Sequence, residues 1–300
     1  MITEKDLLIN NKSYTNKDFV QIYSELLQLA KELSNKYDPE ASNESDPFIV
    51  ILKLLGFIGD KINYNVDKNI LERFMPSATQ ESSMRELCDS LIRKGYIKNK
   101  KVYESMMKVD RIDFSPRYAY MDSPQPINYN VTISAPHMHA YCLELLKDHL
   151  KEGGRALDVG FGSGYLTVAM SKMMNDKGIA VGIEHIQELC EFAKKNISRS
   201  HKKLIDEKRV VLIQGDGRLG CKQYAPYNCI HVGAAAETIP KDLVDQLAKG
   251  GRLVVPVGSE NGDQYITIID KDLNGQISVR KELGVRYVPL TSVKKQLRGY

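Results

Sequence analysis

A glycine-rich turn is the part of this sequence that most plainly suggests chemistry. Gly160, Gly162 and Gly164 alternate with other residues, after an apolar run and before a helical pattern. Glycine allows the backbone to approach a ligand closely where the N–H groups of a helix N-terminus converge. A dinucleotide-binding turn would have its third glycine at position 165, which is Tyr165 here. The turn therefore predicts a ligand site of a different kind.

Three acidic residues stand at the ends of successive predicted strands, beside this turn. Asp158 lies two residues before the first glycine, Glu184 lies 20 residues after Gly164, and Asp216 follows the third strand. A carboxylate at the end of the second strand can accept hydrogen bonds from both hydroxyls of a ribose, and Asp216 is placed to meet an adenine. Each acid could instead cap the helix that follows it. Their grouping beside one glycine turn favours the ligand site.

From residue 155 onward, short apolar runs rich in β-branched residues alternate with helical patterns. This alternation predicts an α/β fold, in which a doubly wound and mostly parallel sheet carries helices on both faces. The predicted strands are 155–159, 180–184, 209–214, 229–232, 252–257 and 265–270, and the predicted helices between them are 165–174, 186–198 and 240–247.

The first part of the chain differs from the rest in charge and in glycine content. The whole chain has 300 residues, of which 42 are basic and 38 acidic, and a net charge of +4. Residues 1–88 contain 10 basic residues, 14 acidic residues and two glycines, whereas the remaining 212 residues contain 32, 24 and 19. Helical patterns cover 19–33, begin at Pro47, and begin again at Ser77 to end at Gly95. We therefore expect an all-helical N-terminal extension.

Cysteine usage and charge distribution bear on where the protein works and what it binds. The five cysteines are widely spaced and form no C-x-x-C pair, so neither a disulfide framework nor a zinc site is expected. No basic and apolar leader opens the sequence, and its most apolar run is interrupted by Lys53. Lysine and arginine are scattered among acidic residues rather than clustered. We expect a soluble, cytoplasmic protein with no nucleic-acid or membrane partner.

The glycine turn resembles that of the S-adenosylmethionine-dependent methyltransferases, which combine a G-x-G-x-G register with an acid two residues before it. The resemblance implies a Rossmann-like class I methyltransferase fold, with S-adenosylmethionine as methyl donor and S-adenosylhomocysteine as product. Enzymes that methylate the exocyclic amines of bases carry an Asn/Asp-Pro-Pro-Tyr turn after the fourth strand. Residues 231–236 of this chain read His-Val-Gly-Ala-Ala-Ala instead. A nucleic-acid methyltransferase is therefore not expected.

A series of further blocks narrows the resemblance to one family. Over about residues 90–300 the chain resembles the protein-L-isoaspartate (D-aspartate) O-methyltransferases. The resemblance implies methyl transfer to the α-carboxyl of L-isoaspartyl and D-aspartyl residues in damaged proteins, after which a succinimide forms and hydrolyses in part to normal aspartate. That carboxyl is ionised at pH 7, so no general base and no metal is needed. Isoaspartyl-containing peptides and proteins are the implied partners of an enzyme that we expect to be a monomer. The blocks are 120–127, 132–140, 157–164, 183–186, 215–218, 231–236, 250–258 and 284–291.

The family resemblance also implies roles for individual residues. Ser134 would be the active-site hydroxyl that orients the acceptor carboxylate, although a helix cap ahead of Pro136 is its other possible role. The implied cofactor contacts are Val131, Thr132, Ile133, Ser134, His139, Asp158, Gly160, Gly162, Gly164, Glu184, Asp216, Gly217 and Thr291.

Three nearby histidines are not expected to bind metal or to act as acid–base catalysts. His137 and His139 lie two residues apart without a third ligand, and His231, in a predicted buried strand, is expected to be a hydrogen-bonded core residue. Two places depart from the family pattern. Phe161 replaces a small hydroxyl residue and could narrow the methionine pocket. Residues 128–130, Asn-Tyr-Asn, replace a glycine-containing lead-in, so the acceptor loop could differ in shape.

The N-terminal segment resembles a different class of protein. Residues 43–47, 57–60, 64–67 and 74–80 are similar to the N-terminal part of the baseplate wedge (baseplate J-like) proteins of contractile-tailed phages. A plain helical extension fits the same residues. We expect a non-catalytic helical segment at 1–89 fused to an isoaspartyl methyltransferase domain at 90–300. The alternative is an assembly protein whose first 89 residues dock into a phage-like particle and whose remainder is cargo.

Overall fold

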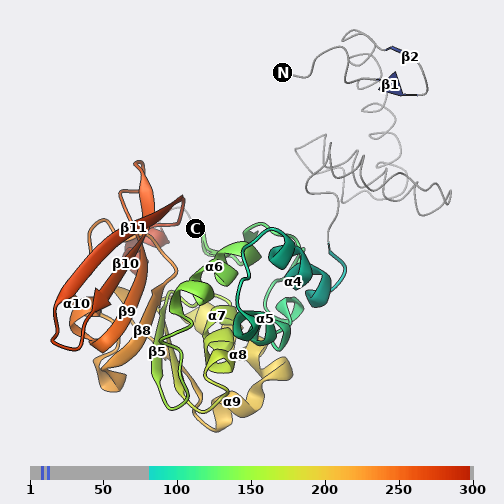
Figure 1. Cartoon of the computed structure of the whole chain (residues 1–300). Coiled ribbons are helices and arrows are strands. Elements are labelled where there is room, and N and C mark those ends of the chain that lie inside the picture. Colours follow the sequence, from blue (N-terminus) through green and yellow to red (C-terminus); the bar gives the residue numbers. More distant parts are fainter. Residues whose placement is uncertain (1–7, 10–11, 14–80, 298–300) are drawn as a thin grey trace. The chain divides into compact units, whose positions relative to one another are not determined.

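The computed structural model describes residues 8–9, 12–13 and 81–297 of the chain (Figure 1). The chain divides into two compact units, Met1–Thr79 and Gln80–Tyr300. We expected the boundary after residue 89, but helix α4 (Met84–Arg93) lies wholly within the second unit. The fusion point that the composition indicated near Cys88 therefore falls inside a helix.

In the first unit, the described residues form a short antiparallel pair of strands. Strand β1 (Leu8–Ile9) pairs with β2 (Lys12–Ser13). The expectation of an all-helical extension is wrong for these four residues, whose backbone groups are paired between strands. The helices expected at 19–33, from Pro47 and from Ser77 begin outside the described residues. The segments that carry the baseplate resemblance lie outside them as well.

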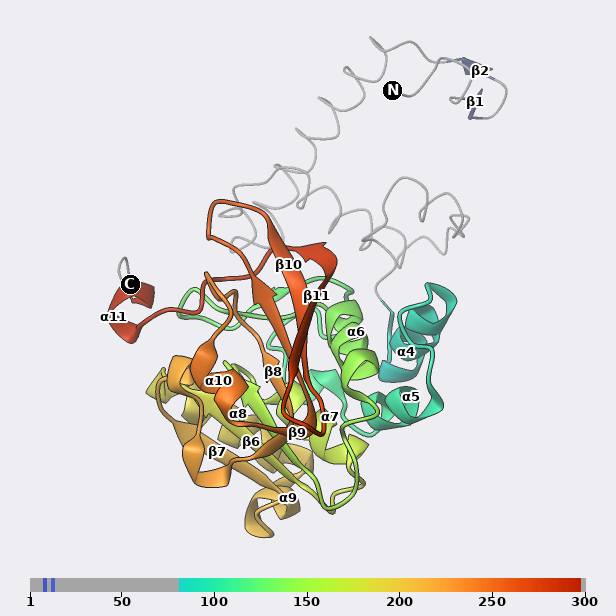
Figure 2. The same ribbon diagram turned by 60° about the vertical axis from the view of Figure 1, so that its left-hand side comes forward.

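The second unit is built on a seven-stranded sheet with the order β11-β10-β9-β8-β5-β6-β7 (Figure 2). The five strands from β9 to β7 are parallel to one another, and at one edge β10 pairs antiparallel with both β9 and β11. The predicted mostly parallel sheet is therefore confirmed. Its strands are β5 (Arg155–Val159), β6 (Ile179–Glu184), β7 (Val210–Gln214), β8 (Tyr227–Val232), β9 (Leu247–Val257), β10 (Gln264–Lys271) and β11 (Ile277–Val285).

The sequence predicted the buried strands and the edge strand β7, but not β11 at the opposite edge. β5 has the predicted bounds because both of its faces are covered, which gives a continuous apolar run. β11 was missed, since it is exposed along almost its whole length and is rich in charged residues. β9 begins at Leu247, where a helix was expected to end, and passes through Gly250 and Gly251. The preceding helix α10 (Lys241–Asp245) is correspondingly short.

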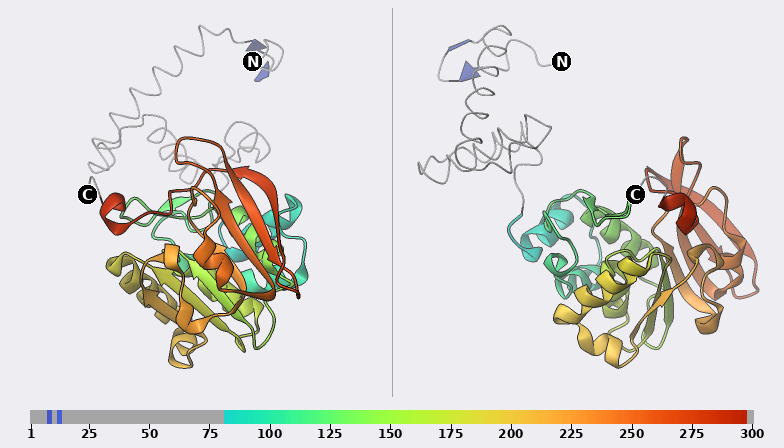
Figure 3. Two further views of the ribbon diagram at one scale, coloured as in Figure 1. Left: turned by 90° about the vertical axis from the view of Figure 1, so that its left-hand side faces the viewer. Right: turned by 180° about the vertical axis from the view of Figure 1, so that it is seen from behind.

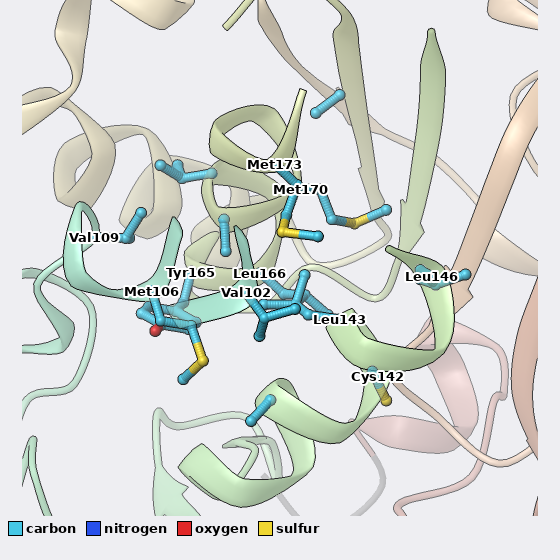
Figure 4. Close-up of a cluster of buried hydrophobic side chains, with 14 of the residues drawn as sticks. Val102, Met106, Val109, Cys142, Leu143, Leu146, Tyr165, Leu166, Met170 and Met173 are labelled. Atoms are coloured by element: carbon cyan, nitrogen blue, oxygen red, sulfur yellow. The ribbon is translucent and has the colours of Figure 1, made fainter. Parts of the chain in front are cut away.

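Helices cover both faces of the sheet (Figure 1, Figure 3). Neighbouring residues of β5 face opposite sides of the sheet, because Ala156 belongs to one buried cluster and Leu157 to the other. On the first side, Met106, Leu143 and Met170 of three different helices meet (Figure 4). On the second side the only α-helix among the described residues is α10. The helices of the first side, besides α4, are α5 (Lys100–Met107), α6 (Pro136–Leu146), α7 (Tyr165–Met173), α8 (Gln187–Ser200) and α9 (Lys202–Asp206).

Helix α4 begins later than predicted and ends as predicted. Its N-cap is Ser83, whose Oγ accepts from the N–H of Glu86, while the Glu86 carboxylate accepts from the N–H of Ser82 at 2.7 Å. The Ser-x-x-Glu spacing at Ser83, rather than the Ser-x-x-Gln spacing at Ser77, starts the helix. Gly95 ends it with a φ of +77°, and its N–H donates to the carbonyl of Ile92.

Within residues 81–297, no helix is long and apolar enough to cross a membrane. The same residues contain no group of three or more His, Cys, Asp or Glu side chains that could hold a metal ion. All five cysteines lie in this part of the chain and are free. They are Cys88, Cys142, Cys190, Cys221 and Cys229, and all except Cys190 are buried.

Candidate functional site

The order of the strands reverses beside β5, which has β6 on one side and β8 on the other. In open α/β sheets, ligands bind at the carboxyl ends of the strands at such a switch point. Two adjoining pockets open there and share Val131, Gly160 and Gly233. The glutamate pocket is further lined by Val159, Ile183, Glu184, His185, Gly217, Ala234, Val288, Pro289, Leu290, Thr291 and Gln296. The serine pocket is further lined by Thr132, Ile133, Ser134, His139, Asp158, Phe161, Gly162, Ser163, Tyr165, Leu166 and His231.

The three glycines of the turn have different surroundings. Gly160 has a φ of +74°, and a Cβ there would point into open space at the junction of the two pockets. A Cβ on Gly162 would lie 3.0 Å from Cδ1 of Ile127, so this glycine lets a neighbouring loop pack closely. Gly164 lines neither pocket, and its Cβ would lie 3.1 Å from Ile197 of α8. The last glycine therefore allows the turn to pack closely against α8.

Glu184 is fixed at the end of β6 by main-chain hydrogen bonds. Its Oε1 accepts from the N–H groups of His185 at 2.8 Å and Ile186 at 3.1 Å. Its Oε2 accepts only a 3.3 Å hydrogen bond from the N–H of Gly162. The side chain thus supports the turn before α8 and also lines the glutamate pocket. One oxygen still has the capacity to accept a ligand hydroxyl.

The contacts of Asp216 fit the alternative role that we considered for it, that of a helix cap. Its Oδ1 accepts from the N–H of Arg218 and caps the 3-10 helix η4 (Gly217–Leu219), and its Oδ2 lies 2.6 Å from Nη2 of Arg218. The Arg218 hydrogen bonds hold the pKa of Asp216 below its ordinary value. The side chain lines a third pocket, the aspartate pocket, which adjoins the glutamate pocket at His185. The other lining residues are Gln214, Gly215, Ser292, Val293 and Lys294.

Asp158 is buried and has both carboxylate oxygens engaged by the protein. Oδ1 lies 2.9 Å from Nδ1 of His231, and Oδ2 accepts a 2.6 Å hydrogen bond from Oγ1 of Thr167. Burial alone would lower the pKa of His231, but hydrogen bonds with Asp158 and Cys142 raise it to about 10. His231 is therefore a buried residue that is hydrogen-bonded to Asp158, as its strand position suggested, and its raised pKa favours the charged ring at neutral pH. The pair forms the floor of the serine pocket.

The loop that leads to Ser134 has an unusual backbone. It is the tip of a hairpin formed by β3 (Gln125–Pro126) and β4 (Thr132–Ile133). Three consecutive residues at the tip have positive φ angles, Asn128 at 73°, Tyr129 at 54° and Asn130 at 57°. Asparagine tolerates this left-handed region better than other non-glycine residues do. The departure from a glycine-containing lead-in therefore keeps the left-handed backbone that a glycine would favour.

We expect Asn128→Ala to lower the free energy of unfolding by about 1 kcal/mol, because alanine is strained at a φ of +73°. Asn128→Gly is the matched variant, and it should leave stability within about 0.5 kcal/mol of the original because glycine adopts this conformation freely. Urea unfolding of both variants measures the difference. Equal stability of the two variants would show that the strain is absent.

Ser134 lies between the hairpin and α6 and does not cap the helix. The N-cap of α6 is Ala135, which makes no side-chain cap hydrogen bond. The Ser134 hydroxyl shares a hydrogen bond with the phenol of Tyr287, whose pKa burial raises well above its ordinary value. The Ser134 carbonyl accepts a 2.7 Å hydrogen bond from Nη2 of Arg111. Its main chain and its side chain are thus held by different residues, and the residue lines the serine pocket.

Phe161 departs from the family pattern, yet the fold makes room for its ring. A Cβ on Gly182 of β6 would lie 2.6 Å from Cδ1 of Phe161, so the ring occupies the space that the missing side chain leaves. Phe161 is only 5% exposed and contributes to the wall of the serine pocket. The ring is therefore packed against the sheet.

The sequence analysis missed several residues that complete the site. Gln296 of α11 (Val293–Gln296) donates from Nε2 to the carbonyl of Tyr129, and its Oε1 lies 2.7 Å from Nε2 of His185. These contacts tie the C-terminal segment to the hairpin tip, and the two lie side by side (Figure 2, Figure 3). Tyr287 and Arg111 were missed too. No spacing rule could have found them, because each reaches the site from a distant part of the chain.

Comparisons with known proteins agree with one another. A family model described as protein-L-isoaspartate(D-aspartate) O-methyltransferase matches residues 82–295. The protein-L-isoaspartate O-methyltransferase of Caenorhabditis elegans is 49% identical over 215 residues, 72% of this chain and 95% of the relative. Protein-L-isoaspartate O-methyltransferase 1 of Arabidopsis thaliana is 49% identical over 218 residues, with 72% and 94% covered. A Plasmodium falciparum protein-L-isoaspartate O-methyltransferase, solved in complex with S-adenosyl-L-homocysteine, matches with a TM-score of 0.67 at 36% identity, covering 70% of this chain and 99% of that one.

Proposed function

Because this chain belongs to the protein-L-isoaspartate(D-aspartate) O-methyltransferase family, we propose that its two adjoining pockets hold the methyl donor and the acceptor carboxyl group. The protein is a repair methyltransferase that methylates L-isoaspartyl residues in damaged proteins and depends on S-adenosylmethionine. The observation that carries the residue assignments is the position of Glu184, Gly160 and Ser134 along one continuous pair of pockets.

The chemistry needs little from the protein besides alignment. S-adenosylmethionine supplies a methyl group on a sulfonium; an acceptor oxygen forms the new C–O bond as the C–S bond breaks, and the electron pair stays on sulfur. The acceptor α-carboxyl has a pKa near ~3.5 and is ionised at pH 7, so no residue has to remove a proton. The chain must hold a weak nucleophile in line in a site with little water, which can account for several kcal/mol of the barrier.

The residues present fit this donor. Glu184 Oε2 faces the glutamate pocket with unused acceptor capacity, as a ribose diol requires. Gly160 leaves open space where any side chain would project, and Gly217 and Thr291 line the same pocket. The serine pocket then receives the methionine end, beside Val131, Thr132, Ile133 and His139. For Asp216 we propose only a position near the adenine, because Arg218 already engages its carboxylate.

Ser134 is the residue that we assign to the acceptor carboxylate. We expect Ser134→Ala to lower kcat/KM for an isoaspartyl peptide about tenfold, because a hydrogen bond to a charged group contributes about 1.5 kcal/mol or more. Affinity for S-adenosylhomocysteine should change much less. Ser198→Ala is the control, because Ser198 is exposed on α8 and its hydroxyl donates to the carbonyl of Lys194. A kcat/KM equal to that of the control variant would remove Ser134 from the acceptor site.

The direct test of the function uses two peptides that differ only in one linkage. Labelled methyl groups should pass from S-adenosylmethionine to an isoaspartyl peptide and not to its normal aspartyl twin. Equal labelling of both peptides would contradict the assigned acceptor. A D-aspartyl peptide in the same assay tests the second acceptor that the family description names.

We further propose that the N-terminal segment takes no part in catalysis, and that the protein works as a monomer in the cytoplasm. The family match begins at residue 82, which supports a separate N-terminal segment. Removal of residues 1–79 should leave kcat/KM unchanged, whereas removal of 1–89 should destabilise the enzyme, because Leu87 and Cys88 of α4 are fully buried. Light scattering of the full chain measures the oligomeric state. A multimer that forms only with residues 1–79 present would favour the assembly alternative and the baseplate resemblance.

A further inference from the structure

Arg111 is completely buried directly behind the serine pocket. It belongs to the 3-10 helix η3 (Arg111–Asp113), and its side chain has no exposed surface. One end of the guanidinium, Nη2, donates to the carbonyl of Ser134 at 2.7 Å. The other end, Nη1, lies 3.1 Å from Nδ1 of His139. A single side chain therefore holds two residues of the proposed site at once.

The charge of Arg111 lacks a counter-charge nearby. Within residues 81–297 no carboxylate forms an ion pair with it, and its Nε has no hydrogen-bond partner. The carboxylate that acts on Arg111 through its charge is that of Asp122, which is already paired with His137 and Lys94. Burial lowers the pKa of Arg111 to about 10, so the group is still charged at neutral pH. A buried, uncompensated cation is costly, and an anion bound in the adjoining pocket would offset that cost.

Arg111 also decides how His139 carries its proton. A guanidinium has donors only, so Nδ1 of His139 must accept and the proton of the neutral ring must be on Nε2. The ring stacks on Tyr165 at 4.8 Å between centroids and lines the serine pocket. Among the described residues, Nε2 has no hydrogen-bond partner. His139 is thus held as a donor that is available to a ligand.

The surroundings of His139 keep the ring neutral. The charged or titratable groups that face it are Arg111 from η3, His231 from β8, His137 from α6 and Tyr165 from α7. Burial, and then the positive charge of Arg111 and His231, lowers the pKa of His139 well below its ordinary value. Protonation cannot then change the donor pattern of the ring near neutral pH.

We propose that Arg111 is a positioning residue, which anchors Ser134 and fixes His139 as a neutral donor from Nε2, so that both groups face the carboxylate of a bound ligand. The inference rests on the proposed function, because that carboxylate belongs either to the amino-acid end of the cofactor or to the acceptor residue. Without the guanidinium, His139 can move its proton to Nδ1. It then presents a lone pair to the carboxylate instead of an N–H group.

The experiment compares Arg111→Met and Arg111→Lys with the native enzyme at about pH 8 and about pH 6, on either side of an ordinary histidine pKa. Affinity for S-adenosylhomocysteine is measured by calorimetry, and KM for an isoaspartyl peptide by methyl transfer. Arg252→Met is the matched control, because Arg252 also donates to a main-chain carbonyl and lines none of the three pockets.

We expect Arg111→Met to bind about tenfold more weakly than the native enzyme at about pH 8 and to recover most of this loss at about pH 6. At the lower pH, the carboxylate of the bound ligand favours the charged His139 ring, which Arg111 no longer repels, and the ring donates from Nε2 again. Arg111→Lys keeps the positive charge and one of the two donor contacts, so it should show a smaller loss and a smaller recovery at the lower pH. Recovery seen in S-adenosylhomocysteine affinity identifies the cofactor carboxylate, and recovery seen only in the peptide KM identifies the acceptor carboxylate.

The inference is overturned if the loss is equal at both pH values, or if neither affinity nor KM changes relative to Arg252→Met. Thermal unfolding shows whether each variant folds, and Arg111→Lys decides the outcome if Arg111→Met does not. Failure of the native enzyme to bind S-adenosylhomocysteine would instead contradict the proposed function. The two failures are therefore distinguishable.

Discussion

Asp158→Ala is expected to lower the free energy of unfolding by about 3–5 kcal/mol at neutral pH. The substitution leaves His231 buried at the floor of the serine pocket without the carboxylate that holds its proton. It also removes the acceptor for the hydroxyl of Thr167, which is itself fully buried. Breaking one side of a buried pair costs much more than losing an exposed ion pair, because the remaining group is not solvated. Urea unfolding with a two-state analysis measures the change.

The pH dependence of this effect follows from His231. Its pKa is raised from an ordinary value of about 6.5 to about 10 in the folded protein, so the folded state holds a proton that the unfolded state has released between these values. The stabilisation is complete below about pH 6.5 and is lost as pH rises through about 10. The loss caused by Asp158→Ala should therefore shrink between these two values.

Asp206→Ala is the control for this prediction. Asp206 pairs with Lys202 on the exposed surface of α9, where an ion pair contributes about 0.5 kcal/mol or less. An Asp158→Ala loss as small as that of Asp206→Ala would show that His231 is neutral in the folded protein. A loss that grows as pH rises would contradict the raised pKa.

The parallel strands could be predicted from the sequence, and the edge strand β11 could not. β5 and β6 are buried on both faces, so their apolar runs are continuous and their lengths are visible in the residue types. β11 is defined by its hydrogen bonds to β10, and its exposed charged side chains carry no burial pattern. Local spacing was also insufficient at α4, where the capping spacings at Ser77 and Ser83 are similar in sequence and the helix begins after Ser83.

Some residues of the site could likewise be predicted from the sequence, and others could not. The glycine turn and Glu184 lie at fixed distances along a strand–turn–helix unit, so local spacing was enough to place them. Arg111 and Tyr287 come from opposite ends of the domain and meet only at Ser134. Such contacts follow from topology, because the hairpin tip brings residues 127–134 across the carboxyl ends of the strands. The role of Gly164 in packing against α8 likewise depends on Ile197, which sequence spacing does not bring near.

The position of Glu184 leads to the largest expected effect on binding. We expect Glu184→Ala to raise the Kd of S-adenosylhomocysteine by about 10- to 150-fold, which corresponds to about 1.5–3 kcal/mol for the loss of hydrogen bonds to a charged acceptor. Glu184 is only 5% exposed and is aimed by two main-chain N–H groups, so the apoprotein already holds it in place. Little ordering is then needed on binding, and most of the hydrogen-bond energy appears as affinity. Calorimetry measures the Kd directly.

Further variants distinguish the loss of ligand contacts at Glu184 from a disturbance of the turn before α8. Glu184→Gln keeps an oxygen for the N–H groups of His185 and Ile186 but removes the charge, so it should preserve stability better than Glu184→Ala and still weaken binding about tenfold. Glu188→Ala changes an exposed acid in the first turn of α8 and should leave the Kd unchanged. If Glu184→Gln binds as tightly as Glu188→Ala, the carboxylate does not meet the ribose. Glu184 would then serve only to cap the turn before α8.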